Sequence, residues 1–367
     1  MIEHFNIEQF RGLQNLTLQN LGNVNIFVGG NNVGKTSVLE AIAIYSLPLD
    51  LLNWVKIARD REINSLRYFS MLESLKWLFP QNSKSIDHDF DQSEILLSGQ
   101  GSFVVKELRA IYQEIQGTID HTQQYNEDTM SALQIGADIE IKIVKNEPRE
   151  IITDNFQIWE NQPIINKRTR NNPFINAEII RPFSHFYQEF SLGLLSMATY
   201  QNFKQDVITL LQIVHPEIID LQILFPPTIQ PNLANRYRPS IYIQHKKLGF
   251  APLTAFGDGV RRLLFMALNL AQVKGGILLI DELETAIHTE ALPQSFSWLI
   301  QWCEKMKVQL FATTHSLEVV DVLLDITQFN TDLVLYKLDE KENHTQGIRL
   351  DRDKLKTIRE RLGNDVR

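Results

Sequence analysis

The segment from Gly29 to Thr36 constrains the fold of this chain more than any other part of its sequence. It reads Gly-Gly-Asn-Asn-Val-Gly-Lys-Thr and fits the pattern G-x-x-x-x-G-K-[ST]. A mostly apolar run from Val24 to Val28 precedes it and favours a strand, and apolar residues at helical spacing follow from Val38 to Ala43. A strand, a glycine loop and a helix in this order predict a loop that binds phosphate.

The residue types in this loop suit a nucleotide phosphate chain bound with Mg²⁺. Glycines let main-chain N–H groups converge on phosphate, and the following helix directs its positive end to the same place. We expect Lys35 to reach the β- and γ-phosphates and the Thr36 hydroxyl to ligate Mg²⁺. The predicted nucleotide-binding residues of this segment are Gly29, Gly30, Asn31, Asn32, Val33, Gly34, Lys35, Thr36 and Ser37.

A pair of acidic residues, Asp281 and Glu282, follows a short and wholly apolar run from Ile277 to Ile280. Such runs are typical of buried strands in parallel sheets. Beside a phosphate-binding loop, Asp281 is predicted to hold Mg²⁺ and Glu282 to orient or deprotonate the attacking water. A helix N-cap is the alternative interpretation of the two acids. The presence of the phosphate-binding loop favours the catalytic one.

A histidine, His315, lies in the sequence Thr-Thr-His-Ser after a predicted strand from Val308 to Ala312. At the end of a strand next to the Asp281 strand, its side chain could hydrogen-bond a γ-phosphate. A purely structural role is the alternative. We predict a phosphate-sensing role, because a helix and a strand separate His315 from Asp281 as neighbouring parallel strands require.

The rest of the chain alternates between strand and helix patterns. Residues 1–28 read as strands, and Trp54 to Phe79 reads as helical. Short strand candidates follow at Glu94 to Leu97, Ser102 to Val105 and Asp138 to Val144, and a strong pattern resumes at Ala177. The later predicted elements are strands at Ala177 to Ile180 and Ile241 to Gln244, one or two helices in Phe186 to Leu211, and a helix in Gly259 to Val273. This alternation predicts a layered α/β fold with a mostly parallel sheet.

With these motifs the chain resembles ABC-type ATPases of the RecF/SMC/OLD-like branch, over residues 1–45 and about 177–340. Phe10-Arg11-Gly12-Leu13 matches the N-terminal F-R-G-L element of that branch, which implies that Arg11 lies near the nucleotide. The segment from Asp281 to His288 resembles its D-E-P-E-x-x-L-H element, with Leu283 where proline is usual. The ligand that the resemblance implies is ATP with Mg²⁺.

The resemblance also implies a loop that closes over the ATP of an opposite subunit. Its match is the segment with Gly257, Asp258 and Gly259, just before the helix that leads to the Asp–Glu strand. A plain loop and helix cap is the alternative. Leu97-Ser98-Gly99-Gln100-Gly101 looks more like the transporter motif L-S-G-G-Q, but its place between two strand candidates favours a hairpin turn.

The implied fold is that of a P-loop NTPase of ABC type. It has a mostly parallel core sheet with helices on both faces, an N-terminal antiparallel β element and an inserted segment. The predicted boundaries are 1–48 and 177–340 for the two parts of the ATPase domain, 49–176 for the inserted helical and β segment, and 341–367 for a charged tail.

Composition excludes some functions and narrows others. The 36 Lys+Arg against 44 Asp+Glu give a net charge of −8, so nothing attracts the whole chain to nucleic acid, and we expect any such contact to be indirect. A single cysteine, Cys303, excludes an internal disulfide and a multi-cysteine zinc site. The absence of a signal-like start and of long apolar runs predicts a cytoplasmic protein without membrane contact.

Together these features predict an ATP-hydrolysing homodimer, or a higher even-numbered oligomer, with ATP sandwiched between subunits. The 27 residues after Glu340 are too few for the TOPRIM domain of OLD-type nucleases, so the resemblance implies a separate effector, such as a TOPRIM-type nuclease, in defence against phage or plasmids. The alternatives are a RecF/SMC-like repair ATPase that clamps DNA, a transporter ATPase, and a sensor that binds ATP without turnover.

Overall fold

The structure, a computed structural model, describes two compact units within one chain. It covers residues 1–61, 70–81, 92–118, 133–146, 150–160, 162, 175–186, 188–226, 238–327, 332–341 and 344–361. The first unit comprises Met1–Leu21, Asn31–Ile175 and Leu338–Ile348, and the second comprises Gly22–Gly30, Asn176–Lys337 and Arg349–Arg367. The boundary between them crosses the phosphate-binding loop after Gly30.

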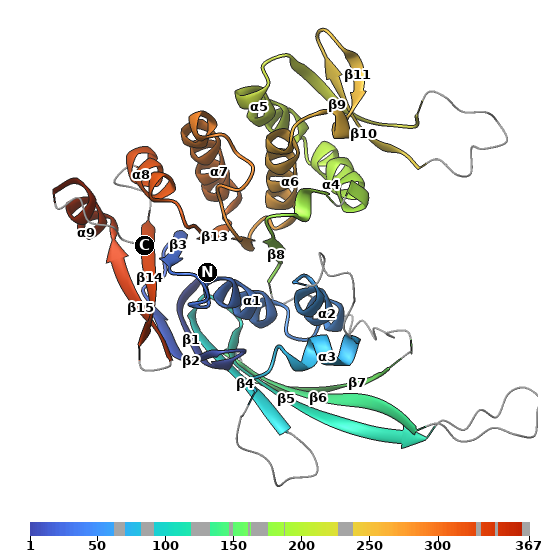
Figure 1. The fold of residues 1–367 in the computed structure, drawn as a ribbon, viewed down its shortest axis with the longest axis vertical. Coiled ribbons are helices and arrows are strands. Elements are labelled where there is room, and N and C mark those ends of the chain that lie inside the picture. The colour runs from blue at the N-terminus through green and yellow to red at the C-terminus, as the bar shows by residue number, and fades with distance from the viewer. Residues whose placement is uncertain are drawn as a thin grey trace, which may run out of the picture. The chain divides into compact units, whose positions relative to one another are not determined.

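The first unit is built on an antiparallel sheet with the strand order β2-β1-β4-β5-β6-β7. Three helices lie on one face of it (Figure 1). Tyr45 shows how they attach, because its ring contacts that of Phe5 and its hydroxyl donates to the carbonyl of Val105. The elements are β1 (Ile2–Phe10), β2 (Leu13–Gln19), β4 (Gln92–Gly101), β5 (Val105–Thr118), β6 (Leu133–Lys145), β7 (Ile151–Trp159), α1 (Lys35–Ser46), α2 (Leu51–Arg59) and α3 (Met71–Lys76).

The second unit contains the parallel strands. In the order β15-β14-β3-β13-β12-β8, the four strands β3, β13, β12 and β8 pair in parallel. Their residues are almost all buried, which explains their continuous apolar runs. The strands of this sheet are β3 (Val24–Gly29), β8 (Ala177–Ile180), β12 (Ile277–Ile280), β13 (Gln309–Thr313), β14 (Leu333–Lys341) and β15 (His344–Asp351).

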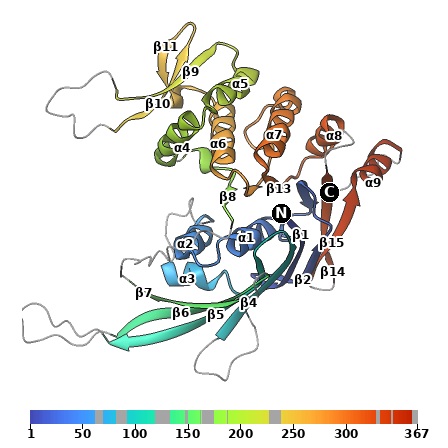
Figure 2. The ribbon, with the colours of Figure 1, turned by 180° about the vertical axis from the view of Figure 1, so that it is seen from behind.

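Helices of the second unit pack on these strands and enclose its core, and a small antiparallel sheet with the order β11-β10-β9 lies beside α4 and α5 (Figure 2). The helices are α4 (Gln188–Tyr200), α5 (Lys204–Val214), α6 (Asp258–Gln272), α7 (Leu292–Met306), α8 (Leu317–Ile326) and α9 (Arg352–Lys356). The remaining elements are β9 (Ile218–Leu224), β10 (Ser240–His245), β11 (Gly249–Pro252), the short 3₁₀ turns η1 (Ser184–Phe186), η3 (Leu253–Ala255) and η4 (Thr289–Ala291), and the π-helical turn η5 (Thr357–Arg361).

The structure corrects several sequence-based boundaries. The single helix expected from Trp54 to Phe79 is divided into α2 and α3, with residues 62–69 outside the described part. The Leu97–Gly101 segment is the end of strand β4 and not the turn itself, which comes after it. Strand β15 and helix α9 lie within the charged tail that the sequence predicts at 341–367. Among the described residues, no helix is long and apolar enough to cross a membrane.

Candidate nucleotide-binding site

The phosphate-binding loop has a backbone conformation that requires glycine at Gly34. Strand β3 ends at Gly29, and Gly34 forms the N-cap of α1 with a φ of +95°. A Cβ atom on Gly34 would lie 2.5 Å from Cδ2 of Leu13, so a larger residue there meets both strain and a clash. Lys35 is the first residue of α1 and is 6% exposed. The loop therefore leads directly into a helix N-terminus, which favours an anion.

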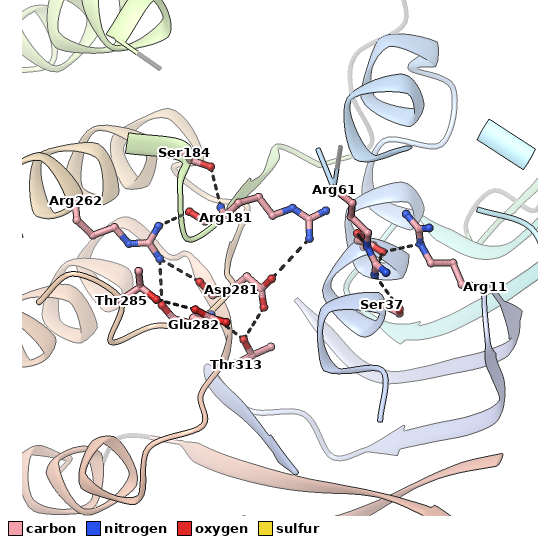
Figure 3. A network of polar contacts seen from close by, with 11 residues as sticks. Arg11, Ser37, Arg61, Arg181, Ser184, Arg262, Asp281, Glu282, Thr285 and Thr313 are labelled. Carbon is pink, nitrogen blue, oxygen red and sulfur yellow. Dashed lines mark hydrogen bonds and ion pairs between the residues drawn. The ribbon is translucent and has the colours of Figure 1, made fainter. Parts of the chain in front are cut away.

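Behind the loop, the first unit holds a buried carboxylate between two arginines. Glu40 in α1 is fully buried, and its Oε2 lies 2.7 Å from Nε of Arg11 and 2.7 Å from Nη2 of Arg61. Arg61 also donates to Oγ of Ser37 at 3.1 Å (Figure 3). Arg11 is thus placed against the helix of the phosphate-binding loop through Glu40. Sequence reasoning missed Glu40 and Arg61, because only the tertiary fold brings them to Arg11.

The carboxyl ends of the parallel strands bring the other motifs together. Strand β13 lies between β3 and β12, with Thr313 opposite Phe27 and Ala312 opposite Ile280. The start of the phosphate-binding loop and the Asp–Glu pair are therefore at the same edge of one sheet. Ligands of open α/β sheets bind at this edge.

Thr313 connects the two acidic residues. Its hydroxyl donates to Oδ1 of Asp281 at 2.7 Å and accepts the main-chain N–H of Glu282 at 2.8 Å. Glu282 has a φ of +51°, a conformation that costs a residue other than glycine some energy. The bond to Thr313, and a bond from the Thr285 hydroxyl to Oε2 of Glu282 at 2.9 Å, hold this residue in place.

Two buried arginines surround the Asp–Glu pair (Figure 3). Arg262 in α6 is fully buried and donates to the main-chain carbonyls of Arg181, Asp281 and Glu282. Burial lowers the pKa of Arg262 to about 10, opposed by the charges of Asp281, Glu282 and Glu284, so it keeps its proton at neutral pH. Arg181 lies with Nη1 at 3.8 Å from Oδ2 of Asp281. Neither arginine was predicted, because no local motif marks them.

The signature-like loop predicted at Gly257 to Gly259 is the start of α6 itself, because Asp258 and Gly259 are the first two residues of that helix. Gly257 is the N-cap of α6, and a Cβ atom there would meet nothing within 4 Å, whereas one on Gly259 would lie 2.9 Å from the carbonyl oxygen of Ala286. Asp258 pairs with Arg261, whose guanidinium lies over the ring of Phe186, 5.0 Å from its centre. The loop thus contacts the segment that follows the Asp–Glu pair.

His315 is exposed, and its main-chain N–H donates to Oε1 of Glu284 at 3.1 Å. The segment that follows β13 is therefore tied to the one that follows β12. The structure thus brings Asp281, Glu282, Thr313 and the His315 segment together in the second unit.

The donor types of the two predicted metal ligands fit Mg²⁺. The predicted ligands, Asp281 and Thr36, offer carboxylate and hydroxyl oxygens, which are the hard ligands that Mg²⁺ prefers. A separate group of residues, His215, Glu217 and His245, could offer three ligands within 4.8 Å of one another. Nδ1 of His245 accepts N–H groups of Lys247 and Leu248, and its Nε2 lies 3.2 Å from Oε2 of Glu217.

These features define the class of the protein. The protein is an ABC-type ATPase of the RecF/SMC-like branch. Its parallel sheet carries a phosphate-binding loop and an Asp–Glu pair at the end of a strand, as that class requires. Residues 129–321, slightly more than half of the chain, match the family described as "AAA domain, putative AbiEii toxin, Type IV TA system", and the chain belongs to this family. The matched part contains Asp281, Glu282 and His315 but not the phosphate-binding loop.

The chain is also similar to individual proteins of other organisms. An "ATP/GTP phosphatase" of Helicobacter pylori is 23% identical over 342 residues, which cover 88% of this chain and 87% of that protein. "Uncharacterized protein MJECL10" of Methanocaldococcus jannaschii is 41% identical over 88 residues, 24% of this chain, and the chain spans only 39% of its length.

Among solved structures, an Smc head bound to the C-terminal winged-helix domain of ScpA aligns with a TM-score of 0.51 and 11% identity, over 96% of this chain and 99% of that chain. At this identity the likeness shows the fold alone. It confirms the predicted ABC-type α/β fold class.

Proposed function

We propose that this ATPase-family protein hydrolyses ATP with Mg²⁺ as a dimer that holds ATP between its subunits, and that it regulates a separate effector. The observation that carries the proposal is the bond network of Asp281, Thr313 and Glu282 at the sheet edge where the phosphate-binding loop begins. This network orients the Asp281 carboxylate and holds the main chain of Glu282, which supports one acid as a metal ligand and the other as the group that activates water.

Each residue has a defined task in this reaction. Thr36 and Asp281 would hold the metal ion, and the bound ion would screen the phosphate charges. Lys35 would bind the terminal phosphates, and Glu282 would orient or deprotonate the water. His315, in the segment that follows β13, would hydrogen-bond the γ-phosphate. Gly257, Asp258 and Gly259 of one subunit would close over the ATP bound by the other.

Dimer closure would couple nucleotide state to an effector. ATP that contacts both subunits favours the closed dimer, and hydrolysis removes that preference. We propose a TOPRIM-type nuclease as the effector and defence against phage or plasmids as the setting. The sequence resemblance and the match to a family described as a putative toxin of a type IV toxin–antitoxin system support this setting.

The experiment is to measure ATP turnover by the purified chain, with and without duplex DNA, together with its mass in solution with and without ATP. We expect slow turnover that DNA does not change and an ATP-dependent dimer. The Lys35→Ala variant is the control and should show no turnover. A wild-type protein that binds no nucleotide would contradict the proposal. Strong stimulation by DNA would favour a DNA-clamping ATPase.

A further inference from the structure

Arg181 and Asp281 lie side by side at the carboxyl ends of two neighbouring strands. Strands β8 and β12 are parallel neighbours with Ile180 opposite Ile280, and each of the two residues comes directly after its strand. The main-chain N–H of Asp281 also donates to the carbonyl of Ile180 at 2.8 Å. The position of Arg181 beside the predicted metal ligand is therefore set by the sheet register and not by a surface loop.

The two side chains form a buried pair of opposite charges. Nη1 of Arg181 lies 3.8 Å from Oδ2 of Asp281, and the side chains are 8% and 11% exposed. The other oxygen of the carboxylate, Oδ1, accepts the Thr313 hydroxyl. At 3.8 Å, Nη1 and Oδ2 are beyond the 2.7–3.2 Å range of a direct hydrogen bond, so these two atoms form an ion pair without one.

The main chain of Arg181 is firmly held. Its N–H donates to Oγ of Ser184 at 2.9 Å, and its carbonyl accepts the N–H of Ser184 at 3.1 Å and the guanidinium of Arg262. A rotation of the long Arg181 side chain can therefore change the partners of its guanidinium. The main chain and the sheet can stay in place.

A divalent cation at Asp281 would change the balance of charge there. Two cations beside one buried carboxylate repel each other, because a low-dielectric site screens them weakly. A phosphate group offers a guanidinium a better partner, since arginine binds phosphate oxygens in a paired geometry. A triphosphate bound with Mg²⁺ would bring both the competing cation and the new partner.

We propose that Arg181 is a nucleotide-binding residue that neutralises Asp281 in the metal-free protein and pairs with the terminal phosphate of a bound nucleoside triphosphate. The inference rests on the proposed function, because it requires a triphosphate at this site. It deepens that function by naming the group that distinguishes triphosphate from diphosphate.

The first test measures the pair without nucleotide or Mg²⁺. Thermal unfolding is followed for the wild type, Arg181→Gln, Asp281→Asn and the double variant. We expect each single variant to unfold at a lower temperature, because it leaves a buried partner unbalanced, and the double variant to lose less than the sum of the two losses. Additive losses would overturn the metal-free part of the proposal.

The second test measures affinity for a non-hydrolysable ATP analogue and for ADP in Mg²⁺. We expect Arg181→Gln to weaken binding of the triphosphate by about tenfold or more, the usual effect of losing a charge-assisted hydrogen bond, and to change ADP binding less than about twofold. Arg181→Lys keeps the positive charge, so its affinity for the triphosphate should lie between those of the wild type and Arg181→Gln. It replaces Arg181→Gln in this test if the glutamine variant does not fold.

The matched control is Arg359→Gln, which removes an arginine 2.7 Å from Asp321 on α8, outside the site. It should bind both nucleotides as the wild type does. Equal losses for ATP and ADP in the Arg181 variants, or no loss, would overturn the inference while leaving the ATPase proposal intact. Failure of the wild type to bind either nucleotide would instead overturn the proposed function itself.

Discussion

Thr313 donates its hydroxyl hydrogen to the buried carboxylate of Asp281 at 2.7 Å, while the same oxygen accepts the main-chain N–H of Glu282. The Thr313 side chain on β13 thus orients the carboxylate of Asp281, the proposed metal ligand. It also holds the main chain of Glu282, the proposed catalytic residue, in the loop after β12. Proposals about either acid therefore depend on Thr313.

Thr313→Val tests this connection. Valine has nearly the same shape but no hydroxyl, so both bonds are lost without a cavity. We expect the free energy of unfolding to fall by about 1–3 kcal/mol, because buried polar groups lose their partner. We also expect ATP turnover to fall while nucleotide binding persists. Urea unfolding and turnover are the measurements, with Thr313→Ser, which keeps the hydroxyl, as the control that should stay close to wild type.

Glu282→Gln tests the assignment of the residue that activates water. The amide keeps the size of the side chain and can still accept from Thr285, but it cannot take a proton. We therefore expect ATP binding to be unchanged, turnover to be abolished, and the ATP-bound dimer to accumulate. Binding, turnover and solution mass with ATP are measured together. Normal hydrolysis by this variant would show that another group activates the water.

Much of the parallel sheet in the second unit could be predicted from sequence because strands β3, β12 and β13 are buried on both faces. Ala177–Ile180 and Ile277–Ile280 were expected with the bounds that the structure has. The first unit was harder. Strand β7 alternates between exposed and partly exposed residues, and Ile151 at its start is 57% exposed, so no apolar period marks it.

The site divides in the same way. The phosphate-binding loop and the Asp–Glu pair are local motifs, and sequence alone was enough to select them. Arg181, Arg262 and Glu40 act through contacts with residues 19 or more positions away, which no local pattern encodes. Their roles follow from which strands are neighbours and which helix covers them.

Arg262→Met tests whether α6 supports the loops after β8 and β12. Methionine fills much of the same space but leaves the carbonyls of Arg181, Asp281 and Glu282 without this donor. We expect the free energy of unfolding to fall by roughly 3 kcal/mol or more, because several charge-assisted bonds are lost inside the protein. Arg262→Lys should recover only part of this, since one ammonium group cannot match the guanidinium fork. Urea unfolding decides, and a methionine variant as stable as the wild type would contradict the expectation.

The two glycines of the signature-like loop should respond differently to alanine. Gly259→Ala places a methyl group 2.9 Å from the Ala286 carbonyl oxygen, so we expect the free energy of unfolding to fall by about 1–3 kcal/mol. Gly257→Ala has open space around it and a φ of −63°, so the fold should be unaffected. If Gly257 closes over the partner's ATP, this variant should nevertheless dimerise less with ATP. Unfolding and solution mass separate the effects, and an unimpaired Gly257→Ala dimer would remove Gly257 from the interface.

The buried side chain of His185 should make the free energy of unfolding depend on pH. Burial lowers the pKa of His185 from its ordinary value of 6.5, with a further contribution from the positive charge of Arg262. Below pH 6.5 the unfolded chain therefore binds more protons at this residue than the folded protein does, and falling pH favours unfolding.

We expect the wild type to lose stability as the pH falls from 6.5 toward the lowered pKa, and His185→Phe, which keeps a ring but cannot titrate, to lose less over the same interval. Urea unfolding of both proteins between about pH 7.5 and 5 measures the difference, which removes the contribution of all groups that the two proteins share. Parallel curves for the two proteins would show that His185 takes up its proton equally in the folded and unfolded states.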